Sequence, residues 1–76
     1  MVELKYGKGY YHLQSVMYDW CEEKFGPGTW ASPQNGEFPS WAKCDWTMDT
    51  IFGNTFVYFK NAQDATLFAL RWSNES

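Results

Sequence analysis

Three residues of this chain belong to types that commonly carry chemistry: His12, Cys21 and Cys44. A histidine acts as a general base only when a nucleophile and an orienting group surround it, and no catalytic motif in the sequence supplies that set. A metal site needs more ligands at close spacing than two distant cysteines and one histidine provide. We therefore predict a protein that is not an enzyme, with no catalytic residues, no metal and no cofactor.

The two cysteines are fewer than the disulfide framework of a small secreted domain requires. Both fall on the predicted apolar face of their elements, Cys21 on a helix and Cys44 on a strand. We predict reduced thiols that pack as small apolar side chains, with a buried disulfide as the alternative.

Aromatic side chains are the main candidates for binding, since the 76 residues include five Trp, five Tyr and six Phe. Exposed rings on a sheet can stack on bases or fill a pocket in a partner. The sharpest candidates are Phe56 and Tyr58, with Ile51 on the same predicted face. Trp30 and Trp41 are further candidates as surface platforms.

The charge balance disfavours broad binding to nucleic acid. Nine acids stand against six bases, which gives a net charge of −3, and the bases are scattered along the chain. Phosphate-driven binding needs clustered cations, so only a local patch with Lys43 and Lys60 is left for that role. Because no apolar stretch approaches the length of a bilayer span, we predict a cytoplasmic protein that does not enter a membrane.

The length predicts a single domain over residues 1–76. A chain this short buries a smaller share of its surface than a large one does, so its stability margin should be thin. A second copy would add stability, and a homodimer is the expected state.

A helix is predicted over residues 10–25, where apolar side chains recur at spacings of three and four. These side chains are Leu13, Val16, Met17, Trp20 and Cys21. Gly26 followed by Pro27 is a helix stop. Residues 26–40 are rich in Gly, Pro, Ser and Asn, which predicts a long irregular loop anchored by Trp30 and Phe38.

Residues 41–52 alternate in polarity, as expected of a half-buried strand. The core face would carry Ala42, Cys44, Trp46 and Met48. A hairpin turn at Gly53-Asn54 would pair Phe52 with Thr55 and Met48 with Phe59. That register places Val57 and Phe59 on the core face and sends Ile51, Phe56 and Tyr58 to the opposite face.

A second helix is predicted from Asn61, an N-cap with Asp64 three positions on, to about Arg71. Alternating apolar side chains in "VELKY" predict an edge strand at the start. The order strand, helix, loop, strand, strand, helix predicts an α+β fold, a small two-layer sandwich with an antiparallel sheet and two helices on one face.

The span 20–72 resembles small uncharacterised proteins carried by tailed bacteriophages, through "DWCEEKFG" and "FGNTFVYFKNAQDATLFALRW". The resemblance implies a phage or marine viral origin and brings no established activity. A weaker resemblance links "FGNTFVYF" to the third-strand motif of the RNA recognition motif, matched at Gly53, Phe56, Val57 and Phe59. Phe52 stands in place of the basic residue and Asn54 in place of a stacking aromatic, so this is an architectural analogy.

These observations predict a binding protein that modulates a host or phage protein through the face bearing Ile51, Phe56 and Tyr58, or through the loop around Trp30. We rank cover of that face by the loop or by a second copy ahead of ligand binding. One alternative is single-stranded nucleic-acid binding, with Phe56 and Tyr58 stacking and the two lysines contacting phosphate. A self-associating structural protein is the other.

Overall fold

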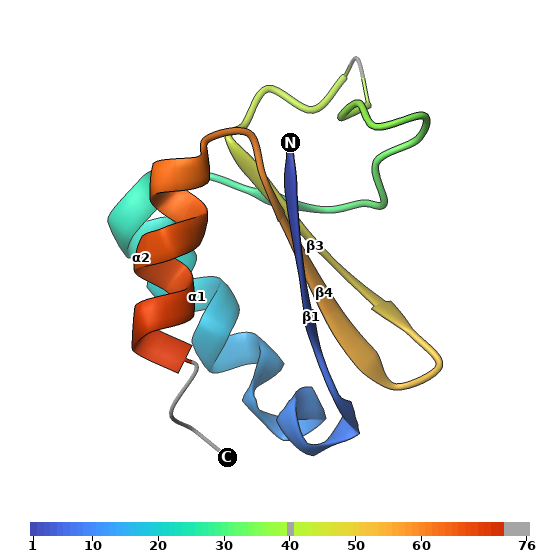
Figure 1. Ribbon diagram of the computed structural model, residues 1–76, viewed down its shortest axis with the longest axis vertical. Coiled ribbons are helices and arrows are strands. Elements are labelled where there is room, and N and C mark those ends of the chain that lie inside the picture. The colour runs from blue at the N-terminus through green and yellow to red at the C-terminus, as the bar shows by residue number, and fades with distance from the viewer. Residues whose placement is uncertain (40, 73–76) are drawn as a thin grey trace.

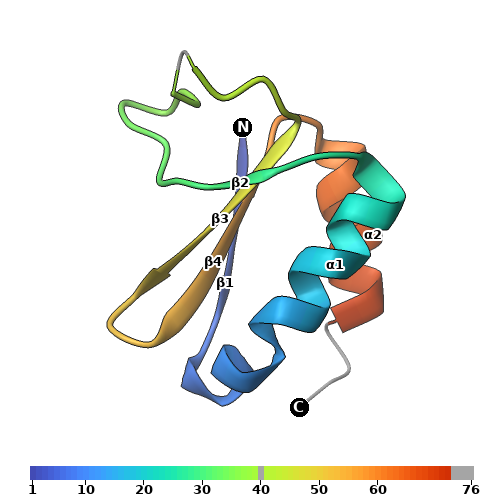
Figure 2. The same ribbon diagram turned by 180° about the vertical axis from the view of Figure 1, so that it is seen from behind.

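The computed structural model describes residues 1–39 and 41–72 and has an α+β fold (Figure 1). The elements in chain order are β1 (Val2–Tyr6), the 3-10 helix η1 (Lys8–Leu13), α1 (Gln14–Phe25), β2 (Thr29–Trp30), β3 (Trp46–Ile51), β4 (Asn54–Phe59) and α2 (Ala62–Trp72). The chain therefore has one strand more than predicted, because β2 lies inside the predicted loop. Both helices lie on the same side of the sheet (Figures 1 and 2).

The sheet is mixed, so the prediction of an antiparallel sheet is wrong at one edge. Its four strands run in the order β1-β4-β3-β2, and β4 is antiparallel to both of its neighbours. β2 is parallel to β3 and pairs Thr29 with Thr47 and Trp30 with Met48. After these two residues, the chain loops back to the beginning of β3, and a return to the starting end makes two neighbouring strands parallel.

The β3–β4 hairpin turns one residue earlier than predicted. Its central residues are Phe52 and Gly53, with φ angles of 53° and 82°, and Ile51 pairs with Asn54. Positive φ at both central positions is the type I′ pattern that suits the twist of a hairpin. The predicted pairing of Met48 with Phe59 is wrong, since Met48 pairs with Val57. The partner shifts by two residues, however, so each side chain keeps its predicted face.

The core lies between the two helices and one face of the sheet. Its buried members are Met17, Cys21, Trp46, Met48, Val57, Phe59, Ala65, Phe68 and Trp72. Aromatic rings join the layers, with centroids 5.4 Å apart for Phe59 and Phe68 and 5.5 Å apart for Phe25 and Phe59. The predicted core face of the hairpin is thus confirmed for Trp46, Met48, Val57 and Phe59.

The first helix and β3 begin later than predicted, and α2 ends slightly later. The first helix ends at Phe25 as predicted, with Gly26 at φ 87°, but residues 8–13 form η1, whose glycine and aromatic content disfavours a regular α-helix. β3 begins only at Trp46, since the Ala42 amide donates to the Pro39 carbonyl at 2.9 Å and turns the chain there. α2 extends to Trp72, one residue past the predicted end.

Trp46 ties the connection after α1 to the sheet. Its side chain is fully buried, and its Nε1 donates to the Gly26 carbonyl at 2.9 Å. A Cβ added at Gly28 would overlap the indole ring, so only glycine lets the backbone pass this close. The Gly28 carbonyl accepts a hydrogen bond from the Tyr18 hydroxyl at 3.0 Å, which holds the glycine in place.

We expect Gly28→Ala to lower the free energy of unfolding by about 2 kcal/mol, because the added methyl group must displace the Trp46 indole. This corresponds to a fall in Tm of roughly 10 °C for a chain of this size. Urea and thermal unfolding followed by circular dichroism measure it. Gly9→Ala is the matched control, since a Cβ there meets nothing within 4 Å. Equal stability of the two variants would contradict the close packing of Gly28 on Trp46.

Candidate functional site

The sequence-predicted binding residues lie in three separate places. Ile51 and Phe56 lie near the β3–β4 turn, on the face of the sheet away from the helices. Trp41 and Lys60 lie around the loop before β3. Trp30 lies on β2 at the sheet edge. The protein therefore does not assemble all of these residues into one site.

Tyr58 is only 6% exposed, so the prediction that it stands open on the sheet is wrong. The loop after β2 approaches it: Ser32 donates to the Asp49 carboxylate and hydrogen-bonds the Tyr58 side chain. Neighbouring Thr47 is fully buried as well. Burial raises the pKa of the Tyr58 hydroxyl, with Glu3 and Asp49 acting in the same direction and the Ser32 hydrogen bond opposing them. Loop cover thus removes this half of the face from contact.

The other half of the face remains open at the β3–β4 turn. Ile51 is 39% exposed and Phe52 is 89% exposed, while Phe56 is half-buried and stacks on Tyr58 with centroids 6.4 Å apart. We call Ile51, Phe52 and Phe56 the turn-end surface. The sequence did not predict Phe52 as part of this surface, because the Gly53-Asn54 turn placed that residue in a strand pair and phenylalanine is not a usual signal for a left-handed turn position.

Phe52 is unusual because its backbone is left-handed, with φ 53°. A bulky residue in this conformation is a steric outlier. The same chain shows the common solution at residues 34–37, where Asn35 and Gly36 have φ angles of 55° and 74°. There the Gln34 and Glu37 backbones exchange hydrogen bonds of 2.9 and 3.0 Å. One turn thus uses Asn-Gly, whereas the other places an exposed phenylalanine at the equivalent position.

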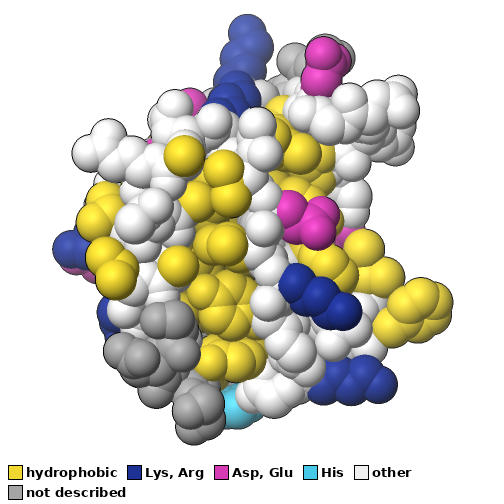
Figure 3. All heavy atoms as spheres, viewed as in Figure 1, with side chains coloured by type: hydrophobic (Ala, Val, Ile, Leu, Met, Phe, Trp, Pro, Cys, Tyr) yellow, Lys and Arg dark blue, Asp and Glu magenta, His cyan; other side chains and the backbone are white. Residues whose placement is uncertain are grey.

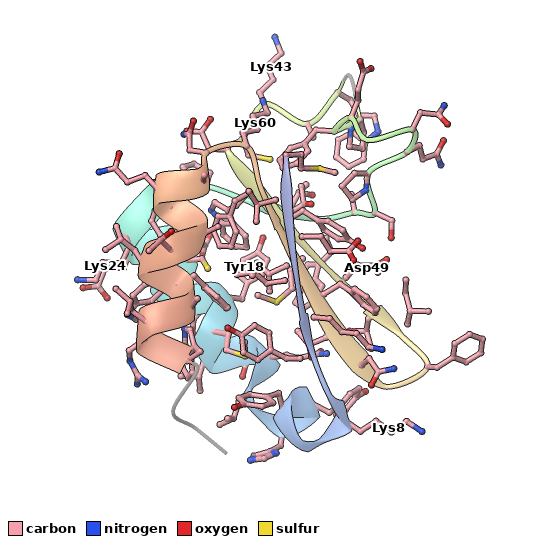
Figure 4. The ribbon with its side chains drawn as sticks, viewed as in Figure 1. Lys8, Tyr18, Lys24, Lys43, Asp49 and Lys60 are labelled. Carbon is pink, nitrogen blue, oxygen red and sulfur yellow. The ribbon has the colours of Figure 1, made fainter. Side chains whose placement is uncertain are left out.

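Basic side chains flank the turn-end surface. The Lys5 Nζ lies 5.9 Å from the centroid of the Phe56 ring, and the Lys8 side chain lies beside Gly53. Asp49 is on the same face, but its carboxylate accepts hydrogen bonds from Ser32 and, at 2.8 Å, from the Thr50 amide. Figure 4 shows Lys8 at this end of the sheet, whereas Lys43 and Lys60 lie at the opposite end. The two lysines predicted to support Phe56 and Tyr58 are therefore remote from the turn.

A second candidate region is the loop before β3, which forms two open hollows of about 430 and 400 Å³. Phe38 and Pro39 line both hollows. The Lys60 Nζ lies 5.3 Å from the Phe38 ring centroid, and Trp41, 63% exposed, lines the smaller hollow. Residues of a loop line both hollows, so they offer less defined contacts than the paired strands of the hairpin do.

Trp30 has a packing role at the β2 edge. Its ring stacks on Tyr18 with centroids 5.1 Å apart, and 49% of the side chain remains exposed. Tyr18 in turn meets Trp46 edge to face at 4.8 Å. Trp30 therefore extends the anchor around Trp46 and lies on the helix side of the sheet, away from the turn-end surface.

The side chains that could bind a metal or act as nucleophiles or bases are dispersed. Within residues 1–39 and 41–72, no three His, Cys, Asp or Glu side chains come together as metal ligands. His12 is exposed in η1. Both thiols are free; Cys21 is fully buried, and burial raises its pKa to about 12, whereas Cys44 is only half-buried. The prediction that Cys44 points into the core is therefore met only in part.

Comparison of the chain with protein-family models, curated proteins and solved structures finds no match. Among the described residues, no helix combines the length and the apolar character needed to cross a membrane.

We expect Phe52→Asn to raise the free energy of unfolding by about 1 kcal/mol, because asparagine tolerates the left-handed conformation better. The variant would reproduce the Asn35-Gly36 turn of the same chain. Phe52→Ala is the matched control: alanine keeps the backbone strain and removes an 89% exposed ring, so stability should hardly change. Urea titration measures both. A large loss of stability in Phe52→Ala would show that the ring packs on the protein.

The thiols should differ in reactivity at about pH 8, with Cys21 reacting with a thiol reagent well after Cys44, because burial shields Cys21 from the reagent and raises its pKa to about 12. Stability should also fall with alkaline pH. Above the ordinary thiol pKa of 9.0 the unfolded chain loses the Cys21 proton, whereas the folded protein holds it until about pH 12. Cys21→Ala should make the free energy of unfolding, measured by urea titration, fall less steeply with pH in the alkaline range. Equal reactivity of both thiols in the folded protein would contradict the burial of Cys21.

Proposed function

We propose that this protein acts by binding another protein through the turn-end surface of Ile51, Phe52 and Phe56, and not by catalysis. This proposal retains the expected aromatic sheet face but moves its centre from Tyr58 to Phe52. It rests on one observation: an 89% exposed phenylalanine in a left-handed backbone conformation.

Phe52 disfavours the isolated fold through its backbone conformation. Its backbone occupies a region that disfavours bulky residues, and its 89% exposed ring gains almost no burial on folding that would offset that cost. Strain of this kind concentrates at sites of function. A partner that buries the ring would recover the hydrophobic contribution, and a rigid two-strand turn presents the ring at little further entropic cost.

The surroundings of the turn define the chemistry of the partner. Lys5 lies over Phe56 and Lys8 lies beside Gly53, whereas the Asp49 carboxylate is already engaged by Ser32. The complementary surface is an apolar pocket that accepts one aromatic ring and carries acidic groups at its rim. Following the resemblance to phage proteins, we propose a host or phage protein in the cytoplasm as the carrier of that pocket.

Single-stranded nucleic acid is the alternative ligand for the same face. The cation–aromatic pair of Lys5 and Phe56 is compatible with it, because nucleic acid requires a base-stacking ring near a cation. Against it stand the burial of Tyr58 and the net charge of −3. This ligand would also give a steep loss of binding with salt, which an apolar protein contact does not.

A capture experiment from host lysate, run with and without nuclease treatment, tests the proposal, with tagged wild-type protein and Phe52→Asn compared. We expect the wild type to retain a protein that the variant loses, and the purified partner to bind the variant at least about 10-fold more weakly, the usual effect of removing an aromatic hot spot. Because Phe52→Asn should fold at least as well as the wild type, the loss would not reflect unfolding.

Leu70→Ala is the matched control, since it removes a 68% exposed apolar side chain from α2 and should leave capture unchanged. Equal loss in both variants would point to non-specific apolar adhesion and contradict the proposal. Capture that disappears after nuclease treatment and falls steeply with salt would replace the protein partner by nucleic acid.

A further inference from the structure

The sheet has one long free edge, at β1. β1 is the terminal strand in the order β1-β4-β3-β2, and within the described part of the chain its five residues pair with β4 alone. An edge strand presents unpaired N–H and C=O groups that can join a strand of another chain. The opposite edge, β2, is only two residues long and offers little to pair with.

The side chains of β1 alternate between the two faces of the sheet. Val2, Leu4 and Tyr6 are half-buried and pack against the core, while Glu3 and Lys5 are exposed on the other face. Figure 3 faces this edge: a column of backbone atoms runs between a hydrophobic strip on the α2 side and one acidic and one basic side chain on the other side. The edge therefore combines apolar side chains with two adjacent opposite charges.

We propose that β1 pairs antiparallel with β1 of a second copy of this chain, about a two-fold axis through Leu4. In that register Val2 lies opposite Tyr6 of the second copy, and Glu3 lies opposite Lys5 of the second copy. The two-fold axis repeats both contacts. The segment Val-Glu-Leu-Lys-Tyr is thus complementary to itself in both apolar character and charge.

The neighbouring registers are disfavoured, so the pairing is specific. A shift of two residues in one direction places the two copies of Glu3 opposite each other, and a shift in the other direction does the same for Lys5. A shift of one residue places charged side chains opposite apolar ones and mismatches the faces of the two sheets. Lys5 on its own would discourage edge pairing, but in the symmetric register Glu3 of the second copy neutralises it.

The dimer formed in this way would be bivalent. Its two sheets join edge to edge with the helices of both copies on the same side, so both turn-end surfaces share the opposite face. The contact is small, because only five residues of each chain pair, and we expect a reversible dimer in the micromolar range. The dimer does not depend on the proposed partner, and a measurement of the oligomeric state alone tests it.

Charge reversal tests the register. Glu3→Lys and Lys5→Glu each place like charges opposite at two symmetric positions, so each should weaken the dimer by about 10- to 30-fold. Both side chains are exposed, and circular dichroism checks that the fold is kept. Sedimentation velocity over micromolar to millimolar concentrations measures the dissociation constants, and the difference should shrink as salt rises.

Two controls separate this register from any other. The double variant Glu3→Lys/Lys5→Glu restores opposite charges at both positions and should regain the wild-type dimer. An equal mixture of the two single variants should form mixed dimers in preference to either homodimer, because lysines of one chain then lie opposite glutamates of the other. A wild type that stays monomeric at millimolar concentration, or single variants that dimerise as well as the wild type does, would overturn the proposal.

Discussion

The packing of Trp46 on the backbone of Gly28 is the contact on which the rest of the structure depends. The indole is fully buried at the start of β3, where it donates to the Gly26 carbonyl and meets Tyr18 edge to face. These contacts hold the end of α1, the connection to β2 and the sheet together at one point. Since a methyl group at Gly28 would overlap the ring, the approach of the chain is set by the absence of a side chain there.

The position of this anchor determines which part of the sheet remains accessible. β2 lies alongside β3. The loop after β2 lies over the face away from the helices, where Ser32 contacts Asp49 and Tyr58. That cover ends before the β3–β4 turn. Ile51, Phe52 and Phe56 therefore stay accessible because the loop closes the other end of the face, and the hairpin holds them on rigid backbone.

The sequence predicted the layers and the core face well, because these depend on periodicity. Val57 and Phe59 lie on the predicted face although the register was wrong by two residues, since side chains alternate with a period of two. Local pattern could not reveal β2: its two residues lie among glycine and proline and pair only through tertiary contact with β3. Tyr58 was among the predicted binding residues, but the loop cover that we ranked above ligand binding closes it, and periodicity could not show how far along the face the loop reaches. Phe52 was missed because a turn with phenylalanine at a left-handed position departs from the usual turn chemistry.

The central claim is that recognition takes place at Phe52 rather than at Trp41, which is the next most exposed aromatic side chain among the described residues. Site-specific photocrosslinking in host cells tests it most directly, with benzoylphenylalanine placed at position 52, at position 41 or at position 70 of otherwise wild-type protein. The account predicts one discrete crosslinked protein from position 52 and none from the other two positions. A crosslink from position 41 alone, or the same products from all three positions, would contradict it.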